Sequence, residues 1–329
     1  MLHYPYRVPN RVPNSVPDRV PDRAPNGMPV TTRREFLRTA ARFTLGTTAT
    51  GALLATGSSA LTGCSGASNG SLPDDVQIVQ RFPQNLVVGR QRMPISLAAG
   101  GGLLTVDGEV ATPSTLRADV VRIDGGRDET ILTGIVAEKH AAELAVPYWL
   151  FRTEITEPGF YRLVLDGGPS DGAAFQVATP SAASVPGVGE VMPPFDTPTF
   201  ADARGVNPIC TRQPEACPLH EVTLREALAA RRPVAYLIGT PAHCSTGTCT
   251  PALEALITLS ERYADQMTFI HAEVYADADA TTLAPAVEAA RMNYEPALFV
   301  VDAAGIIVAR LDAVFDGVEL DAVLSELVS

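Results

Sequence analysis

Short hydrophobic segments recur from about residue 76 to residue 178, separated by clusters of Gly, Pro and Asp. In one of them, residues 116–123, apolar and polar residues alternate, which is typical of a strand with one buried face. The segments predict strands at 76–82, 95–98, 116–123, 148–155, 160–165 and 173–177. We therefore expect residues 76–178 to form an all-β domain.

Within this domain, the sequence Glu157-Pro-Gly-Phe-Tyr-Arg-Leu-Val-Leu165 resembles the turn and late strand of immunoglobulin-like sandwiches. The resemblance implies an immunoglobulin-like β-sandwich. A cysteine pair of the antibody type is missing, so the prediction rests on the spacing of the strands. Trp149 is the only tryptophan, and we expect it in the core, because a large aromatic side chain contributes most when it is buried.

From residue 220 the pattern changes to helices that alternate with apolar strands. Thr223 and Glu226 form a capping box that predicts a helix to about residue 230, and Thr250-Pro251 predicts the start of a second helix. The predicted order is helix, strand, helix, strand, helix, strand, strand, helix. The later elements are expected at 267–275, 281–292, 297–302, 306–311 and 317–328, and the first strand at 233–239.

This order resembles the thioredoxin fold, and the resemblance covers about residues 220–329. Its motifs are His243-Cys244-Ser-Thr-Gly-Thr-Cys249, between the first strand and the second helix, and Tyr294-Glu295-Pro296, before a late strand. The resemblance implies a thiol–disulfide oxidoreductase in which Cys244 attacks and Cys249 resolves. It also implies that Pro296 is cis and faces the cysteines. The expected partners are thiols or disulfides of envelope proteins and a redox partner, and no cofactor is expected.

The motif departs from the family pattern in two ways. Four residues separate Cys244 from Cys249 instead of two, and Ala242-His243 replaces the usual tryptophan. Residues five apart in a regular helix lie about 8–9 Å apart, too far for a disulfide, so residues 245–248 must form a turn, which Gly247 permits. A helix N-terminus lowers a cysteine pKa, and the longer spacing leaves open which cysteine is the nucleophile. His243 either helps to ionise Cys244 or lies at the surface.

Two other functions fit the same segment. Sco-type copper chaperones share the thioredoxin fold, and Cys249-Thr-Pro251 is close to their motif. That resemblance implies a Cu(I) site formed by Cys244, Cys249 and His271, since thiolates are soft ligands. In the third interpretation the cysteine pair is a permanent disulfide, and the chain is a non-catalytic envelope interaction module.

A second cysteine pair, Cys210 and Cys217, lies in the predicted linker at residues 179–219. In an oxidising compartment we expect a structural disulfide here, worth about 2–3 kcal/mol for so short a loop. A zinc site formed by Cys210, Cys217 and His220 is the alternative. It lacks a fourth ligand that can be recognised in the sequence.

The N-terminal region carries export signals. Residues 1–63 contain a low-complexity, proline-rich extension followed by Arg33-Arg34 and a weakly hydrophobic stretch, which resembles a twin-arginine signal. Leu61-Thr62-Gly63-Cys64 resembles a lipobox, so Cys64 is expected to carry a lipid that anchors the protein to the outer face of the cytoplasmic membrane. Residues 64–75 have the composition of a flexible tether.

Charge excludes some classes of partner. The first 63 residues hold eight of the 25 basic and three of the 37 acidic residues, which leaves 17 basic and 34 acidic residues in the rest of the chain. An acidic surface repels phosphate backbones and anionic lipids, so we expect no nucleic-acid binding. The membrane association is therefore assigned to the lipid on Cys64.

Overall fold

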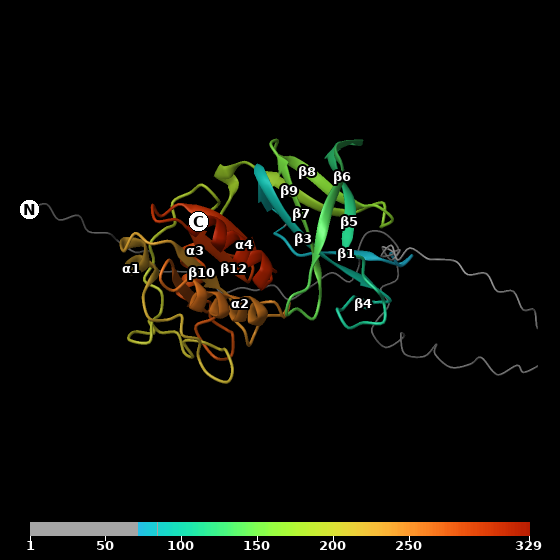
Figure 1. Ribbon diagram of the computed structural model, residues 1–329. Coiled ribbons are helices and arrows are strands. Elements are labelled where there is room, and N and C mark those ends of the chain that lie inside the picture. The colour runs from blue at the N-terminus through green and yellow to red at the C-terminus, as the bar shows by residue number, and fades with distance from the viewer. Residues whose placement is uncertain (1–71, 84) are drawn as a thin grey trace, which may run out of the picture. The chain divides into compact units, whose positions relative to one another are not determined.

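The computed structural model describes residues 72–83 and 85–329, which form an all-β domain followed by an α/β domain (Figure 1). The predicted twin-arginine signal, the lipobox with Cys64 and most of the predicted tether at 64–75 lie outside the described residues. Within the described ranges, every helix is too short or too polar to cross a membrane.

The strands of the first domain pair edge to edge in one sheet of nine strands. Its order is β1-β3-β7-β6-β5-β8-β9-β2, with β4 paired to β3, and β2 runs parallel to β9 whereas the other described pairs are antiparallel. The strands are β1 (Gln77–Gln80), β2 (Asn85–Val87), β3 (Gly89–Ala99), β4 (Gly102–Leu103), β5 (Thr115–Asp124), β6 (Arg127–His140), β7 (Tyr148–Ile155), β8 (Gly159–Leu165) and β9 (Ala173–Ala178).

The inward side chains of this sheet share a single apolar core. Met93 on β3, Val120 on β5 and Leu163 on β8 are fully buried members of it. Trp149 is also fully buried, and its indole N–H donates to the carbonyl of Pro113 at 3.1 Å, which confirms the predicted core position. The all-β prediction is confirmed as well. An immunoglobulin-like sandwich has two sheets, whereas hydrogen-bonded pairing here links all the strands, so that resemblance stays a prediction.

The second domain has the predicted order of elements. They are α1 (Leu224–Ala229), β10 (Val234–Ile238), α2 (Cys249–Arg262), β11 (Thr268–Ala272), α3 (Pro285–Ala290), β12 (Ala297–Val301), β13 (Ile307–Asp312) and α4 (Gly317–Val328). The sheet order is β11-β10-β12-β13, in which β10 and β11 are parallel and the other pairs are antiparallel. The capping box of Thr223 and Glu226 at the start of α1 is present as predicted.

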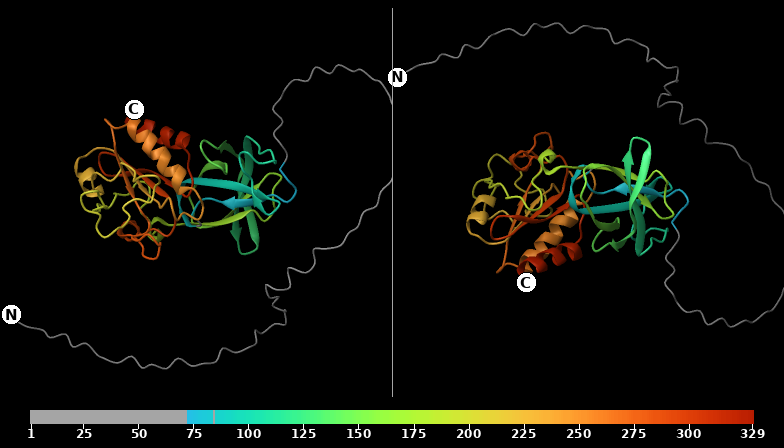
Figure 2. Two further views of the ribbon diagram at one scale, coloured as in Figure 1. Left: turned by 90° about the horizontal axis from the view of Figure 1, so that it is seen from below. Right: turned by 90° about the horizontal axis from the view of Figure 1, so that it is seen from above.

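Helices cover both faces of this sheet, as the burial of β10 shows. Ala235 and Leu237 belong to a core that contains residues of α2 and α4. Val234, Tyr236 and Ile238 belong to a second core with residues of α1 and α3. Both views in Figure 2 show α2 and α4 side by side. Strands buried on both faces read as continuous apolar segments, which is why β10 was recognisable in the sequence.

The second helix begins earlier than the sequence predicted. Cys249 is the first residue of α2, and Thr248 is its N-cap, without a side-chain cap hydrogen bond. The predicted N-cap at Thr250 is therefore wrong. Pro251 still fits, because the backbone N–H groups of the first helical turn have no partner within the helix and a missing one is tolerated there. The correction places Cys249 itself at the N-terminus of the helix.

The predicted linker at residues 179–219 packs against the α/β domain. It contains one short 3₁₀ turn, Pro180–Ala182, and Val185 and Met192 are buried in the core shared with α1 and α3. The backbone N–H of Met192 donates to the carbonyl of Gly305 at 2.8 Å. Most of this segment is therefore held in place by the domain that follows it.

A buried ion pair connects the two domains. Arg92 on β3 donates from Nε and Nη2 to the two carboxylate oxygens of Glu319 on α4, at 2.7 and 2.6 Å. The Glu319 side chain is only 1% exposed, and it also accepts hydrogen bonds from Tyr148 and Arg152 at 2.7 and 2.8 Å. Each carboxylate oxygen of this buried acid is therefore paired.

Candidate functional site

The structure brings Cys244 and Cys249 together across a short turn between β10 and α2. Their sulfur atoms lie within 4.8 Å of each other. Gly247 has a φ of +68°, and its N–H donates to the carbonyl of Cys244 at 3.0 Å. A left-handed backbone conformation favours glycine, so the predicted turn at residues 245–248 is confirmed.

Cys249 is the buried member of the pair, with 1% of its surface exposed. Its thiol donates to a carboxylate oxygen of Glu295 at 3.4 Å, and the same oxygen accepts from the backbone N–H of Thr240 at 2.9 Å. Burial raises the pKa of Glu295. A carboxyl group that both receives the thiol hydrogen bond and has a raised pKa is suited to accept a proton from Cys249.

Cys244 is half-buried, and its sulfur faces several donors. It accepts hydrogen bonds from the N–H of Cys249 at 3.3 Å and from the hydroxyl of Thr246 at 3.2 Å. The S–H of Cys249, when it points to this sulfur instead of to Glu295, is the largest cause that lowers the pKa of Cys244 to about 4. Thr246 and the N–H groups of Cys249 and Thr248 lower it further, against the effect of burial. Conversely, the pKa of Cys249 is raised. Burial lowers the pKa of Arg81 in the β domain. The charge of the Cys244 thiolate acts in the opposite direction and offsets part of this shift.

Pro296 and Cys249 both lie next to Gly239, so the predicted position of Pro296 facing the cysteines stays a prediction. The Glu295–Pro296 peptide bond is cis, which confirms the predicted isomer. Gly239, just after β10, faces both groups: a Cβ atom built on it would lie 3.2 Å from Cβ of Pro296 and 3.5 Å from Sγ of Cys249. Only a residue without a side chain fits here without displacing its neighbours.

His243 has other partners. Its Nε2 donates to the carbonyl of Ala278 at 2.9 Å, and its ring packs edge-on against Tyr275. Among the described contacts, none joins its ring to the sulfur of Cys244. His243 is partly buried and held by the segment at residues 275–278, and its role in ionising Cys244 stays a prediction.

A second cluster consists of Cys210, Cys217, His220 and His271, all buried, whose potential ligand atoms lie within 4.8 Å of one another. Nδ1 of His271 is 3.7 Å from Sγ of Cys210, 3.5 Å from Sγ of Cys217 and 3.3 Å from Nε2 of His220. A hydrogen bond with Cys217 is the largest cause that lowers the pKa of Cys210. Both cysteines are free thiols in the structure, so the disulfide between them stays a prediction.

His271 is the ligand that the copper-chaperone alternative places beside Cys244 and Cys249. The group of potential ligands at that pair consists of Cys244, Cys249 and Glu295, and His271 is not part of it. The three residues of the predicted copper site are therefore not brought together. His271 is instead the fourth member of the second cluster, which sequence reasoning missed because it is 51 residues from His220 along the chain.

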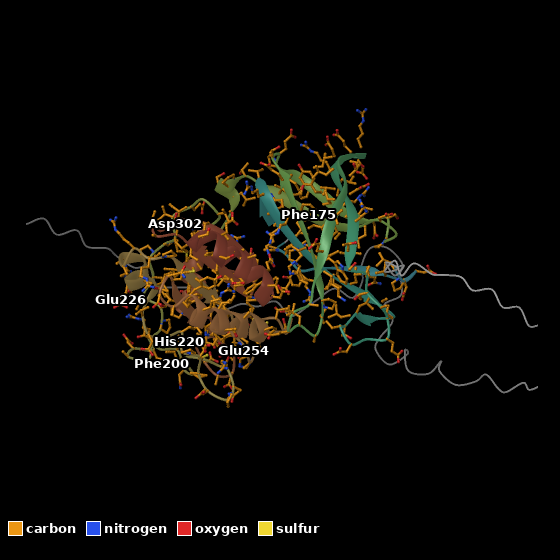
Figure 3. The ribbon with its side chains drawn as sticks, viewed as in Figure 1. Phe175, Phe200, His220, Glu226, Glu254 and Asp302 are labelled. Atoms are coloured by element: carbon orange, nitrogen blue, oxygen red, sulfur yellow. The ribbon has the colours of Figure 1, made fainter. Side chains whose placement is uncertain are left out.

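The segment that carries Cys210 and Cys217 also contacts Ala242, close to the turn that joins Cys244 to Cys249. Thr211 donates from its N–H and its hydroxyl to the buried carboxylate of Glu273, and its hydroxyl oxygen accepts from the N–H of Ala242 at 3.1 Å. Arg212 forms a bidentate pair with Glu254 on α2, at 2.6 and 3.1 Å. Figure 3 labels Glu254 and His220 in the α/β domain.

Comparison of the chain with models of known protein families gives no match, and comparison with curated proteins gives none either. What is inferred about function therefore depends on the geometry of the two clusters.

Proposed function

We propose that the chain is a thiol–disulfide oxidoreductase that acts through Cys244 and Cys249. The observation that carries this proposal is the asymmetry of the pair. Cys244 is half-buried, and its sulfur accepts the N–H of Cys249 at the first residue of α2 at 3.3 Å. Cys249 is buried, and its thiol donates to Glu295. An accessible cysteine with a lowered pKa is the attacking member of such a pair.

The first half of the cycle is an exchange at Cys244. Its thiolate attacks one sulfur of a substrate disulfide, the substrate S–S bond breaks, and the other substrate sulfur leaves as a thiolate that takes a proton from water. The product is a mixed disulfide between Cys244 and the substrate. Because the Cys244 pKa is lowered to about 4, the attacking thiolate is present throughout the neutral range.

In the second half, Cys249 releases the substrate. Its proton passes to Glu295, and its sulfur attacks Sγ of Cys244, so that the bond to the substrate breaks and a disulfide forms between Cys244 and Cys249. The substrate disulfide is reduced to two thiols and the protein dithiol is oxidised. A redox partner then restores the dithiol. The reverse sequence oxidises a substrate dithiol, so the partner sets the direction.

The arrangement of the α/β domain supports the proposed kinship to thioredoxin-like proteins. The cysteine pair lies between β10 and α2, and Pro296, which precedes β12, is a neighbour of Gly239, as Cys249 is. The proposed substrates are protein thiols or disulfides of the cell envelope. This location depends on the predicted export signal and on the lipid at Cys64.

The decisive measurement is the reduction potential of the Cys244–Cys249 pair in glutathione or dithiothreitol buffers, with alkylation to count free thiols. We expect a reversible couple between about −270 and −120 mV, the range of known exchange catalysts. Cys244→Ser and Cys249→Ser should each abolish the couple, and Cys244→Ser should also abolish mixed-disulfide formation. A potential far below this range would identify a permanent structural disulfide and refute the proposed activity.

A further inference from the structure

We infer that Cys210, Cys217, His220 and His271 bind a structural zinc ion. Two cysteines and two histidines are a ligand set that closed, tetrahedral zinc sites use. All four residues are buried. The inference does not depend on the proposed redox activity, because none of these side chains takes part in the exchange reaction.

The distances within the cluster match a tetrahedral ion. Zinc binds sulfur at about 2.3 Å and nitrogen at about 2.0–2.1 Å, so tetrahedral angles place two nitrogen ligands about 3.3 Å apart and a sulfur and a nitrogen ligand about 3.6 Å apart. Nδ1 of His271 lies 3.3 Å from Nε2 of His220. The same Nδ1 is 3.7 and 3.5 Å from the sulfurs of Cys210 and Cys217.

The second nitrogen of His271 fixes the ring in the tautomer that a metal needs. Its Nε2 is 2.8 Å from the carbonyl of Gly239. A carbonyl only accepts, so the proton of the neutral ring lies on Nε2, and Nδ1 directs a lone pair towards the two sulfurs and His220. Histidines that bind metals commonly donate their other N–H to a carbonyl or carboxylate in this way.

Charge and ligand type favour zinc over other ions. Two thiolates and two neutral imidazoles around a divalent cation form a centre with no net charge, which lowers the cost of its burial. Calcium and magnesium require oxygen ligands, whereas sulfur and imidazole suit zinc. A disulfide between Cys210 and Cys217 would not explain why two buried imidazoles face the sulfurs, whereas a zinc site requires them there.

The site is closed, so its role is structural. The ring of Phe200 packs edge-on against His220, with 5.5 Å between ring centroids, and Figure 3 labels both residues. The four ligands leave no position for a substrate. The ion would join the segment at residues 210–220 to β11. Through Thr211 it would support the backbone at Ala242, close to the turn that joins Cys244 to Cys249.

The test measures the zinc content of the purified full-length chain by mass spectrometry, without chelators during purification. We expect about one zinc per chain in the wild type. Cys217→Ser and His271→Asn should each retain at least tenfold less zinc. The matched controls are the double variant Cys244→Ser/Cys249→Ser and the variant His243→Asn, which should keep the wild-type content.

If the ligand variants fail to fold, the test uses the absorption spectra of the wild type and of the double variant after their zinc is exchanged for cobalt. Tetrahedral ligand-field bands with a thiolate-to-cobalt charge-transfer band in both proteins are expected. Loss of zinc or of these bands in the double variant would show that the metal binds at Cys244 and Cys249, and it would overturn the inference. A wild type that contains no zinc and has Cys210 joined to Cys217 in a peptide map would overturn it as well.

Discussion

Nε2 of His271 donates a hydrogen bond to the carbonyl oxygen of Gly239 at 2.8 Å. Gly239 also lies against Cys249, since a Cβ atom at this position would be 3.5 Å from Sγ of Cys249. One residue of the backbone therefore contacts both cysteine clusters. The cysteine–histidine cluster and the redox site are neighbours at the end of β10, although their cysteines are far apart in the sequence.

Gly239→Ala should destabilise the protein by about 1–3 kcal/mol, the usual cost of an added methyl group in a packed region. The added Cβ would lie 3.2 Å from Cβ of Pro296, so Pro296 or Cys249 has to move. Denaturant unfolding measures the free energy. Gly102→Ala is the control, because its Cβ would meet no atom within 4 Å. Equal effects of the two substitutions would show that Gly239 is not tightly packed.

Alkylation of Cys244 should stay fast as the pH is lowered from 8 and should fall only near pH 4, because its pKa is lowered to about 4 and the thiolate is the reactive form. In Cys249→Ala the pKa of Cys244 should rise, because the hydrogen bond from the Cys249 side chain, the largest cause that lowers it, is lost. Iodoacetamide labelling followed by mass spectrometry gives the rate at each pH. A wild-type rate that already declines below pH 8 would contradict the lowered pKa.

The stability of the reduced protein should depend on pH through the same group. The folded-state pKa of about 4 is below that of an unfolded cysteine, about 8.5, so between these values the unfolded state binds one more proton and stability rises with pH. The contribution of Cys244 is complete above about pH 8.5 and is lost as the pH falls through 4. The test compares the unfolding free energies of the wild type and of Cys244→Ser, both reduced. The difference between them should grow as the pH rises from about 4 to about 8.5.

Glu295→Gln should slow the release step while leaving the attack by Cys244 intact. An amide cannot accept the proton of Cys249, and a general base contributes at least about a hundredfold to such a transfer. The mixed disulfide should therefore accumulate, which non-reducing mass spectrometry of quenched samples detects. Glu288→Gln, at an exposed position of α3, is the control. Release of the substrate at the wild-type rate in Glu295→Gln would show that Glu295 does not accept the proton of Cys249.

Arg92→Ala should cost about 3 kcal/mol or more, because it deprives a buried carboxylate of its bidentate partner. Arg152→Ala removes another partner of Glu319, but the Arg152 side chain is 58% exposed, so its loss should cost less than about 1 kcal/mol. Denaturant unfolding of the two variants provides the comparison. If they are equally stable, the pair between Arg92 and Glu319 does not hold the domains together.

The strands that alternate or are fully apolar could be predicted from the sequence, and the longest strand could not. β7 and α4 have the predicted limits, Tyr148–Ile155 and Gly317–Val328. In contrast, β6 was missed because most of its side chains are exposed or partly exposed and its sequence contains no regular apolar alternation. It is a strand because its backbone pairs with β5 and β7.

The sequence by itself determined the features that depend on neighbours within a few residues. The capping box at Thr223, the turn at Gly247 and the order of the elements in the α/β domain are of this kind. Only the tertiary structure decided which distant side chains meet. His271 meets Cys210 across 61 positions because its backbone N–H on β11 donates to the carbonyl of Leu219 in the segment that carries the cysteine. Arg92 reaches Glu319 across 227 positions because the β domain contacts α4. Local patterns in the sequence carry no information about such contacts.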